Sequence, residues 1–238
     1  MPKATVHVIL ASLESAQFLV RTAEGYQIGI GAFEIGTAMP AAASLRQAAA
    51  PWLDRLTLAT QESCHLGMLS AGDVVYLDRR DSPGDGLRFT VRIGQRLPAY
   101  GTALGKAMLS QLTDAEISQL YPSDLPPVTE ATLRSRAELL ELLGDVRHRG
   151  FATESEESTA GVRCVGVAVA VPHGVVGLSV TAPVHRAGLD DLLQHVPLLR
   201  EAIGSLRSAA VAGHWLHALP GPSGSSDGFA EASVSLRS

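Results

Sequence analysis

The sequence predicts an α+β fold in which helices pack on an antiparallel sheet. With 238 residues, 46% of them hydrophobic and 18% charged, the chain has enough apolar side chains for a substantial core. Its patterning follows the order helix, strands, helices, hairpin, helix. The strongest strand signal lies in Gly150–Arg186, where two apolar runs flank Pro172, His173 and Gly174.

This central segment predicts a β-hairpin with two different faces. If His173 and Gly174 are the two loop residues, Gly174 supplies the positive φ that tight hairpin turns need. Because strand side chains alternate, one face is then a branched apolar wall, which pairs Val171 with Val176, Val169 with Leu178, Val167 with Val180 and Val165 with Ala182. The other face is small and partly polar, pairing Ala170 with Gly177, Ala168 with Ser179, Gly166 with Thr181 and Cys164 with Pro183.

The apolar face is expected to bury against helices as the main core. The small face has two interpretations. A helix packs unusually close to it, or the small side chains leave a void in which Ser179 and Thr181 orient a ligand, as in an apolar pocket with a few placed polar groups.

The first 60 residues are predicted to hold two helical regions. Lys3–Leu13 has a helical apolar stripe after Pro2, and a small hairpin with strands Phe18–Val20 and Tyr26–Ile28 follows. This unit is too small to bury a core alone. After the apolar stretch Ile30–Ile35, helical spacing resumes over Pro40–Ser63, with Leu53, Leu56 and Ala59 or Thr60 facing inward and with Pro51 either kinking the helix or starting a second one.

The middle of the chain is predicted to alternate strands and capped helices. His65–Ser70 and Val74–Arg79 form a hairpin, and Leu87–Ile93 is a further strand after a polar loop. Thr102 caps a helix over Leu104–Leu112, and Thr113 with Glu116 forms the capping box of the next helix. The remaining elements are a loop at Pro122–Thr129, a helix at Glu138–Arg149 ended by Gly150, a largely helical Leu189–Leu219, and a polar, disordered tail over 220–238.

Composition excludes several classes of protein. The net charge is −5, so no overall basic field attracts nucleic acid, and no run reaches the roughly 18 apolar residues of a membrane span. Met1 does not open a signal peptide. Cys64 and Cys164 are too few for a disulfide framework, so a cytoplasmic location is expected.

An enzyme is not expected. Cys64 and His65 are adjacent, so on a strand their side chains point to opposite faces and make a poor nucleophile–base pair. No HExxH, CxxC, P-loop or GxSxG motif is present. A metal site built from Cys64, His65 and Cys164 lacks ligand spacing, and no metal or cofactor is predicted.

Four segments together resemble the IclR-type bacterial transcriptional regulators. They are ESCHLGMLSAGDVVYLDR (Glu62–Arg79), RIGQRLPAYGTALGKAML (Arg92–Leu109), RGFATESEESTAGVRCVGVAV (Arg149–Val169) and LSVTAP (Leu178–Pro183), within roughly Leu45–Leu206. The resemblance implies a GAF-like effector-binding domain that senses a small organic acid or aromatic metabolite. It also implies a homodimer or homotetramer.

The front of the chain, Pro2–Gly36, resembles the recognition helix and wing of that family's winged helix-turn-helix. The resemblance implies DNA contacts by Lys3, Thr5 and His7. The family normally has two preceding helices and a cation where this chain has Val8. Either a longer reading frame continues upstream of Met1, or the chain is an effector-binding, oligomerising relative that has lost DNA binding.

Charge favours weak DNA binding by this front segment. Residues 1–36 hold two cations, Lys3 and Arg21, against Glu14, Glu24 and Glu34. Phosphate contacts dominate DNA affinity and need cations. A lone recognition helix with this balance is expected to bind DNA poorly.

The family's effector contacts, carried over by motif, form one predicted site. The backbone N–H groups of Ala103 and Leu104, after Thr102, would hold a carboxylate at the start of a helix. Ser179 and Thr181 lie on the small face of the hairpin, flanked by Cys164 and Glu154, and Phe89 and Leu97 would supply apolar wall. The family often has Asp at the position of Glu154, whose longer side chain changes the cavity.

Each of these residues also has a purely structural interpretation. Thr102 caps a helix and does nothing more, Glu154 is one of several solvated acids, and Cys164 is a small core residue. Tyr100 closes the pocket or covers the sheet edge.

These interpretations divide the chain into four parts: a partial winged helix-turn-helix at 1–38, a linker helix at 39–51, the GAF-like domain at 52–219 and the tail at 220–238. Ligand binding is expected to shift an oligomer between two arrangements of the linker near Pro40–Gln47, through different affinities for the two states.

Overall fold

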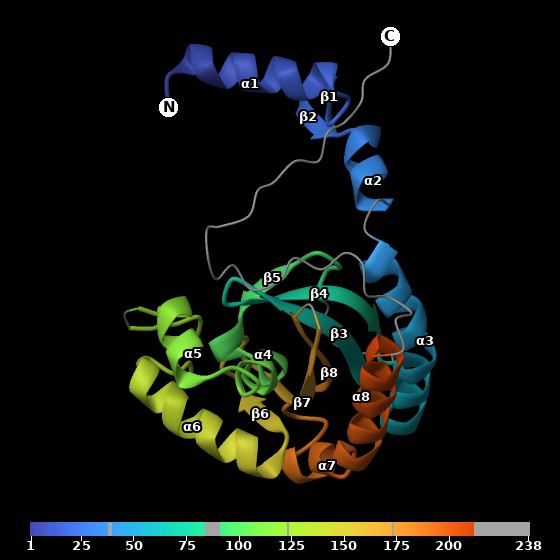
Figure 1. Cartoon of the computed structure of the whole chain (residues 1–238), viewed down its shortest axis with the longest axis vertical. Coiled ribbons are helices and arrows are strands. Elements are labelled where there is room, and N and C mark those ends of the chain that lie inside the picture. Colours follow the sequence, from blue (N-terminus) through green and yellow to red (C-terminus); the bar gives the residue numbers. More distant parts are fainter. Residues whose placement is uncertain (38–39, 84–90, 123, 173, 212–238) are drawn as a thin grey trace.

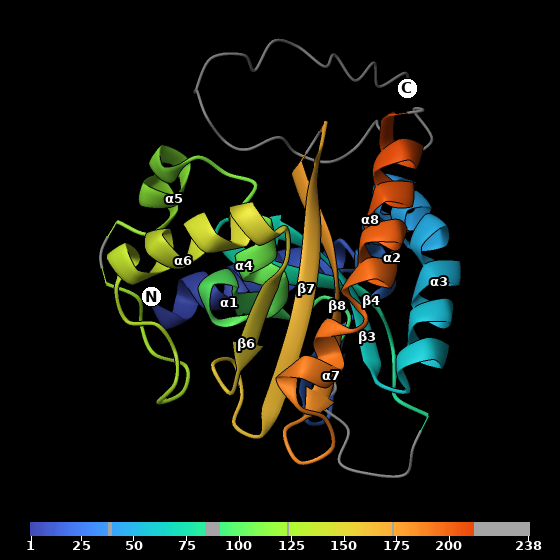
Figure 2. The ribbon, with the colours of Figure 1, turned by 90° about the horizontal axis from the view of Figure 1, so that it is seen from below.

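The computed structural model describes residues 1–37, 40–83, 91–122, 124–172 and 174–211. In it, helices cover both faces of a six-stranded antiparallel sheet, which confirms the α+β prediction (Figures 1 and 2). No helix in this described part combines the length and apolar character that a membrane crossing needs.

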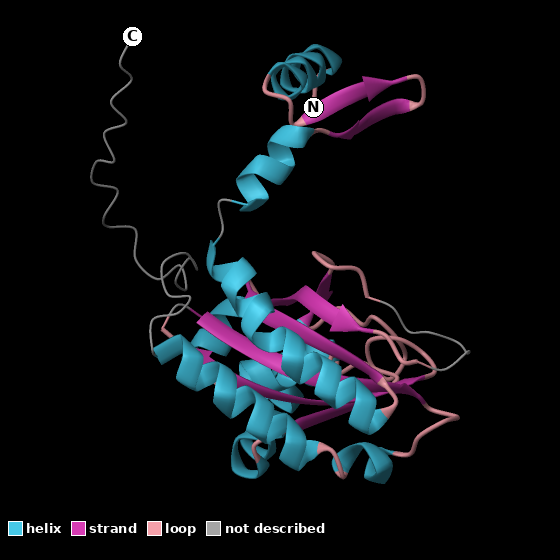
Figure 3. Ribbon diagram, turned by 90° about the vertical axis from the view of Figure 1, so that its right-hand side faces the viewer, coloured by secondary structure: helices cyan, strands magenta, loops and turns pink. Residues whose placement is uncertain are grey.

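The N-terminal unit consists of a helix, a hairpin and a second helix. The helix α1 (Lys3–Ser15) and the two-stranded β1 (Leu19–Thr22) and β2 (Gly25–Ile28) match the prediction, and α2 (Ile30–Thr37) forms where only an apolar stretch was expected. Figure 3 shows this unit beside the larger domain. No side chain of α1 is fully buried, in line with a unit too small to form its own core.

The helix α3 (Pro40–Thr60) runs without a break through Pro51, so this proline does not start a second helix. Its inward face consists of Leu45, Ala49, Leu53 and Leu56, all fully buried. These contacts lie on both sides of Pro51 and hold the helix together despite the hydrogen bond that proline removes. The helix therefore continues past position 51, where we placed the end of the linker.

The large sheet has the strand order β5-β4-β3-β8-β7-β6. Its strands are β3 (Ser63–Ser70), β4 (Asp73–Arg80), β5 (Arg96–Pro98), β6 (Ala152–Ser155), β7 (Val162–Val171) and β8 (Gly174–Pro183). The predicted β3–β4 hairpin is confirmed: Ala71 and Gly72 both have positive φ, at 51° and 83°. Such a pair of dihedrals matches the twist of the flanking strands.

The predicted register of the β7–β8 hairpin is wrong by two residues. The structure pairs Val171 with Gly174, so Gly174 belongs to the strand and not to the turn; His173 itself lies outside the described residues. Cys164 therefore pairs with Thr181, and Gly166 with Ser179. Because the error is an even number, each side chain keeps its predicted face.

The branched face of this hairpin packs against α3, α7 (Leu189–Leu193) and α8 (Val196–Val211) in the main core. The small face lies toward α4 (Ala103–Leu109), on the side that also carries α5 (Asp114–Leu120) and α6 (Arg136–Arg149) (Figure 2). The helix predicted over Leu189–Leu219 is interrupted at Gln194 and His195, and its part beyond Val211 lies outside the described residues.

The strand predicted at Leu87–Ile93 is not found where it is described. Residues 84–90 lie outside the described part, and 91–93 are not a strand. Gly94, with φ of 83°, donates its amide to the Tyr76 carbonyl and turns the chain, so that the edge strand β5 begins at Arg96 instead. Pro98 at its end has no N–H to pair, a position that suits an edge strand.

Helix caps were predicted well. Thr102 Oγ1 accepts from the Gly105 amide at 2.8 Å, Thr113 and Glu116 form the capping box of α5, and Gly150 ends α6 in the left-handed region. A second capping box, of Ser135 with Glu138, starts α6 earlier than predicted.

Candidate functional site

The helix α4 approaches the small face of the hairpin very closely. A Cβ added at Gly166 would lie 2.9 Å from the backbone N of Leu104, and one at Gly177 would lie 2.7 Å from Leu104 Cδ1. The close-helix interpretation therefore holds for this part of the face. It also brings the first turn of α4 against strand β7.

A cluster of polar side chains lies on the same face of the sheet, beside the start of α4. We define the polar cluster by six residues from five strands: His65, Tyr76, Glu154, Cys164, Ser179 and Thr181. His65 is the direct neighbour of Ser179 on the adjacent strand, and Cys164 has Glu154 and Thr181 as its two neighbours. All six are buried, with 2–9% of each residue exposed.

Four members of this cluster form a continuous chain of hydrogen bonds. The Cys164 thiol donates to Glu154 Oε1 at 3.1 Å and lies 3.1 Å from Thr181 Oγ1. Thr181 Oγ1 in turn lies 3.3 Å from Nδ1 of His65. We call Glu154, Cys164, Thr181 and His65 the polar chain.

Glu154 is held by backbone and side-chain donors rather than solvated. Its Oε2 accepts from the Glu157 amide at 2.9 Å, and its Oε1 accepts from the Ser158 hydroxyl at 3.2 Å. The interpretation of Glu154 as a solvated acid is wrong, since the residue is 2% exposed. Burial raises its pKa, opposed by hydrogen bonds from Cys164 and from the Glu157 backbone.

Burial also keeps the other cluster groups neutral. It lowers the pKa of His65 to about 4, with the charge of Arg79 adding to the effect. It raises the pKa of the Cys164 thiol well above its ordinary value and that of Tyr76 as well. The site therefore offers a ligand neutral hydrogen-bonding groups beside one carboxyl.

Lys106, the basic residue nearest to this site on α4, is committed to another partner. The residue is fully buried, and its Nζ donates to both carboxylate oxygens of Glu157, at 2.6 and 2.8 Å. Glu157 lies in the segment between β6 and β7, where Thr132 Oγ1 donates to its carbonyl at 2.7 Å. This ion pair ties that segment to α4.

Several hydrogen-bonding groups of the site are left without protein partners. Among the described residues, Nε2 of His65 is buried and makes no hydrogen bond. The amides of Ala103 and Leu104 belong to the first turn of α4, which has no intrahelical acceptors, and Thr102 caps the amide of Gly105 instead. The two amides can donate to an anionic or carbonyl oxygen, whereas Nε2 of His65 donates or accepts according to the tautomer of the ring.

The structure brings most of the predicted site residues together. Glu154, Cys164, Ser179 and Thr181 share the polar cluster, and Thr102, Ala103 and Leu104 lie at the start of α4, which contacts β7 and β8. Leu97 is half-buried on β5 and packs against the core that includes Tyr76 and Leu104. Phe89 lies outside the described residues. The hydroxyl of Tyr100 donates to the Pro126 carbonyl at 2.7 Å, so this side chain secures a loop.

Sequence reasoning missed His65 and Tyr76 as members of the site. We considered His65 only with Cys64, as a catalytic pair or a metal ligand. The pairing of β3 with β8 brings it to Ser179, and this long-range pairing has no local sequence signal. Tyr76 lies beside His65 because β4 pairs with β3, and its ring is edge-on to that of His65 at a centroid distance of 5.7 Å.

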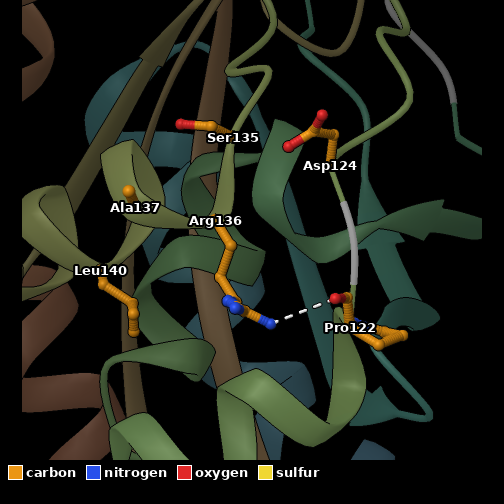
Figure 4. A pocket seen from close by; sticks show the side chains of 6 residues that line it. All are labelled: Pro122, Asp124, Ser135, Arg136, Ala137 and Leu140. Carbon is orange, nitrogen blue, oxygen red and sulfur yellow. Dashed lines mark hydrogen bonds between the residues drawn. The ribbon is translucent and has the colours of Figure 1, made fainter.

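Other surface features do not add a site. A surface pocket of about 380 Å³ is lined by Pro122, Asp124, Ser135, Arg136, Ala137 and Leu140, whose side chains are drawn in Figure 4. Its polar groups already serve the fold, since Arg136 donates to the carbonyls of Tyr121 and Pro122 and Ser135 caps α6. Within the described residues, no three or more His, Cys, Asp or Glu side chains are grouped to hold a metal ion.

The predicted DNA contacts Lys3, Thr5 and His7 are all exposed on α1. Lys3 is the only Lys or Arg side chain in this helix. The structure thus leaves these three side chains free for a partner, with a low density of positive charge.

The pKa of His65 predicts an acid-sensitive contribution to stability. Its folded pKa of about 4 lies below the ordinary histidine pKa of 6.5, so the unfolded chain binds the proton first. The stability from neutral His65 is present above about pH 6.5 and is lost as the pH falls toward 4. We expect wild type to lose about 3 kcal/mol relative to His65→Gln over this interval. Urea unfolding at each pH measures this loss. The same change in the free energy of unfolding with pH in both proteins would contradict the prediction.

Comparison with known proteins shows which proteins this chain resembles. A family model described as "Bacterial transcriptional regulator IclR C-terminal" matches residues 38–206. The transcriptional regulator XynR of Escherichia coli K12 is 34% identical over 172 residues, which cover 71% of this chain and 68% of XynR. KdgR of the same organism is 32% identical over 207 residues, 85% of this chain and 78% of KdgR. An IclR homologue from Microbacterium hydrocarbonoxydans, solved with 4-hydroxybenzoate, superimposes with a TM-score of 0.74 at 22% identity, covering 89% of this chain and 87% of that one, which shows a shared fold.

Proposed function

The chain belongs to the IclR family of bacterial transcriptional regulators, and from this premise we propose that it senses a small organic or aromatic acid in the polar cluster and regulates transcription in response. One observation carries this proposal: uncommitted donors of α4 and the buried polar cluster lie on one side of the sheet. The relatives are named as transcriptional regulators and not as enzymes.

The chemistry of the site supports an acid as the ligand. The amides of Ala103 and Leu104 favour a carboxylate, because the positive end of the backbone dipoles points out of the helix start. The only cation of α4, Lys106, is paired with Glu157, so in α4 the backbone amides and not a lysine would bind the ligand carboxylate. Ser179 and Thr181 then orient the rest of the ligand, and Gly166 allows the close approach of α4 that puts its first turn there.

A thermal-shift screen of small aliphatic and aromatic acids tests this function. Selective stabilisation by one class of acid is expected, because a ligand that binds only the folded state raises the unfolding temperature. At a free concentration of 100 times Kd the gain is about 2.7 kcal/mol. The matched amides or methyl esters serve as controls, and equal shifts with acid and ester would contradict a carboxylate site.

DNA binding belongs to the same proposal through α1. Its exposed Lys3, Thr5 and His7 are the proposed contacts, and a homodimer or homotetramer would place two or more such helices on one operator. The second candidate is an effector-binding, oligomerising protein that does not contact DNA. The balance of two cations and three carboxylates in residues 1–36 favours it.

Fluorescence anisotropy with DNA from the promoter of the protein's own gene separates these two functions. The regulator is expected to bind this DNA more tightly than a scrambled duplex, and Lys3→Ala is expected to reduce binding and the salt dependence together. Equal, weak binding of both duplexes, unaffected by Lys3→Ala, would favour the second candidate. Glu14→Gln, on the same helix, is the matched control for a change of charge.

A further inference from the structure

His65 presents its two ring nitrogens to different surroundings. Nδ1 lies 3.3 Å from Thr181 Oγ1, whereas Nε2 has no partner in the described part of the chain. The residue is only 2% exposed, and a buried polar atom without a partner costs free energy. A nitrogen in this position is well suited to a ligand that supplies the missing hydrogen bond.

The polar chain fixes which hydrogen bond Nε2 can make. With Glu154 ionised, the Cys164 thiol donates to Glu154, the Thr181 hydroxyl donates to Cys164 Sγ, and Nδ1–H of His65 donates to Thr181. A neutral imidazole has one N–H, so Nε2 is then bare and accepts.

Protonation of Glu154 reverses the direction of every hydrogen bond in the polar chain. A proton that arrives at Nε2 releases the Nδ1 proton to Thr181, which passes its own proton to Cys164, which passes its own to Glu154 Oε1. His65, Thr181 and Cys164 each give up one proton and receive one, Glu154 gains one, and the whole chain gains one. His65 then carries its proton on Nε2 and donates.

We propose that His65 Nε2 is a further ligand-binding group of this site, and that the protonation of Glu154 sets whether it accepts from a ligand hydroxyl or donates to a ligand carbonyl. This inference deepens the proposed function and rests on it. It assigns the site the ability to discriminate hydroxy acids from keto acids.

The groups around the chain allow Glu154 to titrate while His65 stays neutral. Burial raises the pKa of Glu154 and the charge of Glu157 adds to this, against the hydrogen bonds from Cys164 and the Glu157 amide and the charge of Lys106. Burial, with the charge of Arg79 adding to it, keeps the pKa of His65 at about 4. Tyr76, the remaining titratable neighbour, is neutral because burial raises its pKa.

Nitrogen NMR of histidine in the ligand-free full chain tests this coupling. The two tautomers have distinct ¹⁵N shifts, and the His65 signals are assigned by their absence in His65→Gln. In wild type we expect the proton on Nδ1 at high pH and on Nε2 once Glu154 is protonated. Because no ligand is added, the result is independent of the proposed effector function.

Three variants make the test specific. In Glu154→Gln the side-chain carbonyl keeps the bond from the Glu157 amide, so its NH₂ faces Cys164 and mimics the protonated acid; we expect the proton on Nε2 at every pH. Cys164→Ser preserves the chain and should keep the pH response, whereas Thr181→Val breaks it and should abolish the response. The same tautomer in wild type at all pH values, or an unchanged response in Thr181→Val, would overturn the proposal.

Discussion

Replacing Gly105 with alanine is expected to destabilise the protein by about 3 kcal/mol or more, at or beyond the upper end of what overpacking usually costs. A Cβ at this position would lie 2.2 Å from the Ala99 carbonyl oxygen and 2.4 Å from Ala99 Cα. These are backbone atoms of the 3₁₀ turn Ala99–Gly101, so no side chain can move aside. The start of α4 must shift, and with it the amides of Ala103 and Leu104.

Gly144→Ala is the matched control for this substitution. Gly144 also lies inside a helix, α6, but a Cβ there meets nothing within 4 Å. We expect this variant to gain about 0.5–1 kcal/mol, the difference in helix cost between glycine and alanine. Urea unfolding of both variants gives the comparison, and a Gly105→Ala protein as stable as Gly144→Ala would contradict the close packing of α4 on the turn.

Breaking the Lys106–Glu157 ion pair is the second change with a large expected effect. Glu157→Gln leaves an ammonium group with no exposed side-chain surface and without its hydrogen-bonded carboxylate, which costs about 3–5 kcal/mol. Lys106→Met should cost less, because the carboxylate of Glu157 retains 15% exposure and can turn to water. In the double variant no unpaired charge is left, and its stability should be close to that of Lys106→Met alone.

A double-mutant cycle with urea unfolding measures this coupling. The exposed pair of Arg55 and Glu201, at 2.9 Å with about half of each side chain accessible, serves as the control, and Glu201→Gln should change stability by no more than about 1 kcal/mol. The buried pair should also resist 0.5 M salt, whereas the exposed one is screened. Strictly additive effects of the Lys106 and Glu157 substitutions would show that the two side chains do not depend on each other.

Local features of the fold could be predicted from the sequence. The caps at Thr102, Thr113 and Gly150 and the β3–β4 hairpin depend on neighbouring residues, and all are confirmed, although the turn is one residue shorter than the predicted Ala71-Gly72-Asp73 because Asp73 pairs with Ser70. The faces of the β7–β8 hairpin were also right, because alternation survives an even register shift. The register itself depends on the turn and on packing against α4, which local patterns do not encode.

Long-range pairing limits what the sequence reveals about the site. Ser179 and Thr181 were found because they share a strand with a clear two-residue period. His65 could not be placed beside them, because the β3–β8 pairing joins segments more than 100 residues apart. Pro51 shows the same limit, since tertiary contacts of Leu45 and Leu53 outweigh its local tendency to end a helix.

Calorimetric titration of the acid selected by the thermal-shift screen tests the central claim most directly. Ser179→Ala removes one hydroxyl from the polar cluster, and we expect Kd to rise about tenfold, the equivalent of one buried hydrogen bond to a charged or polar ligand. Ser118→Ala, at a half-buried position of α5 whose hydroxyl donates to the Asp114 carbonyl, should bind as wild type does. If both variants keep the wild-type Kd, the ligand does not bind at the small face of the hairpin, and the assignment of the sensor site fails.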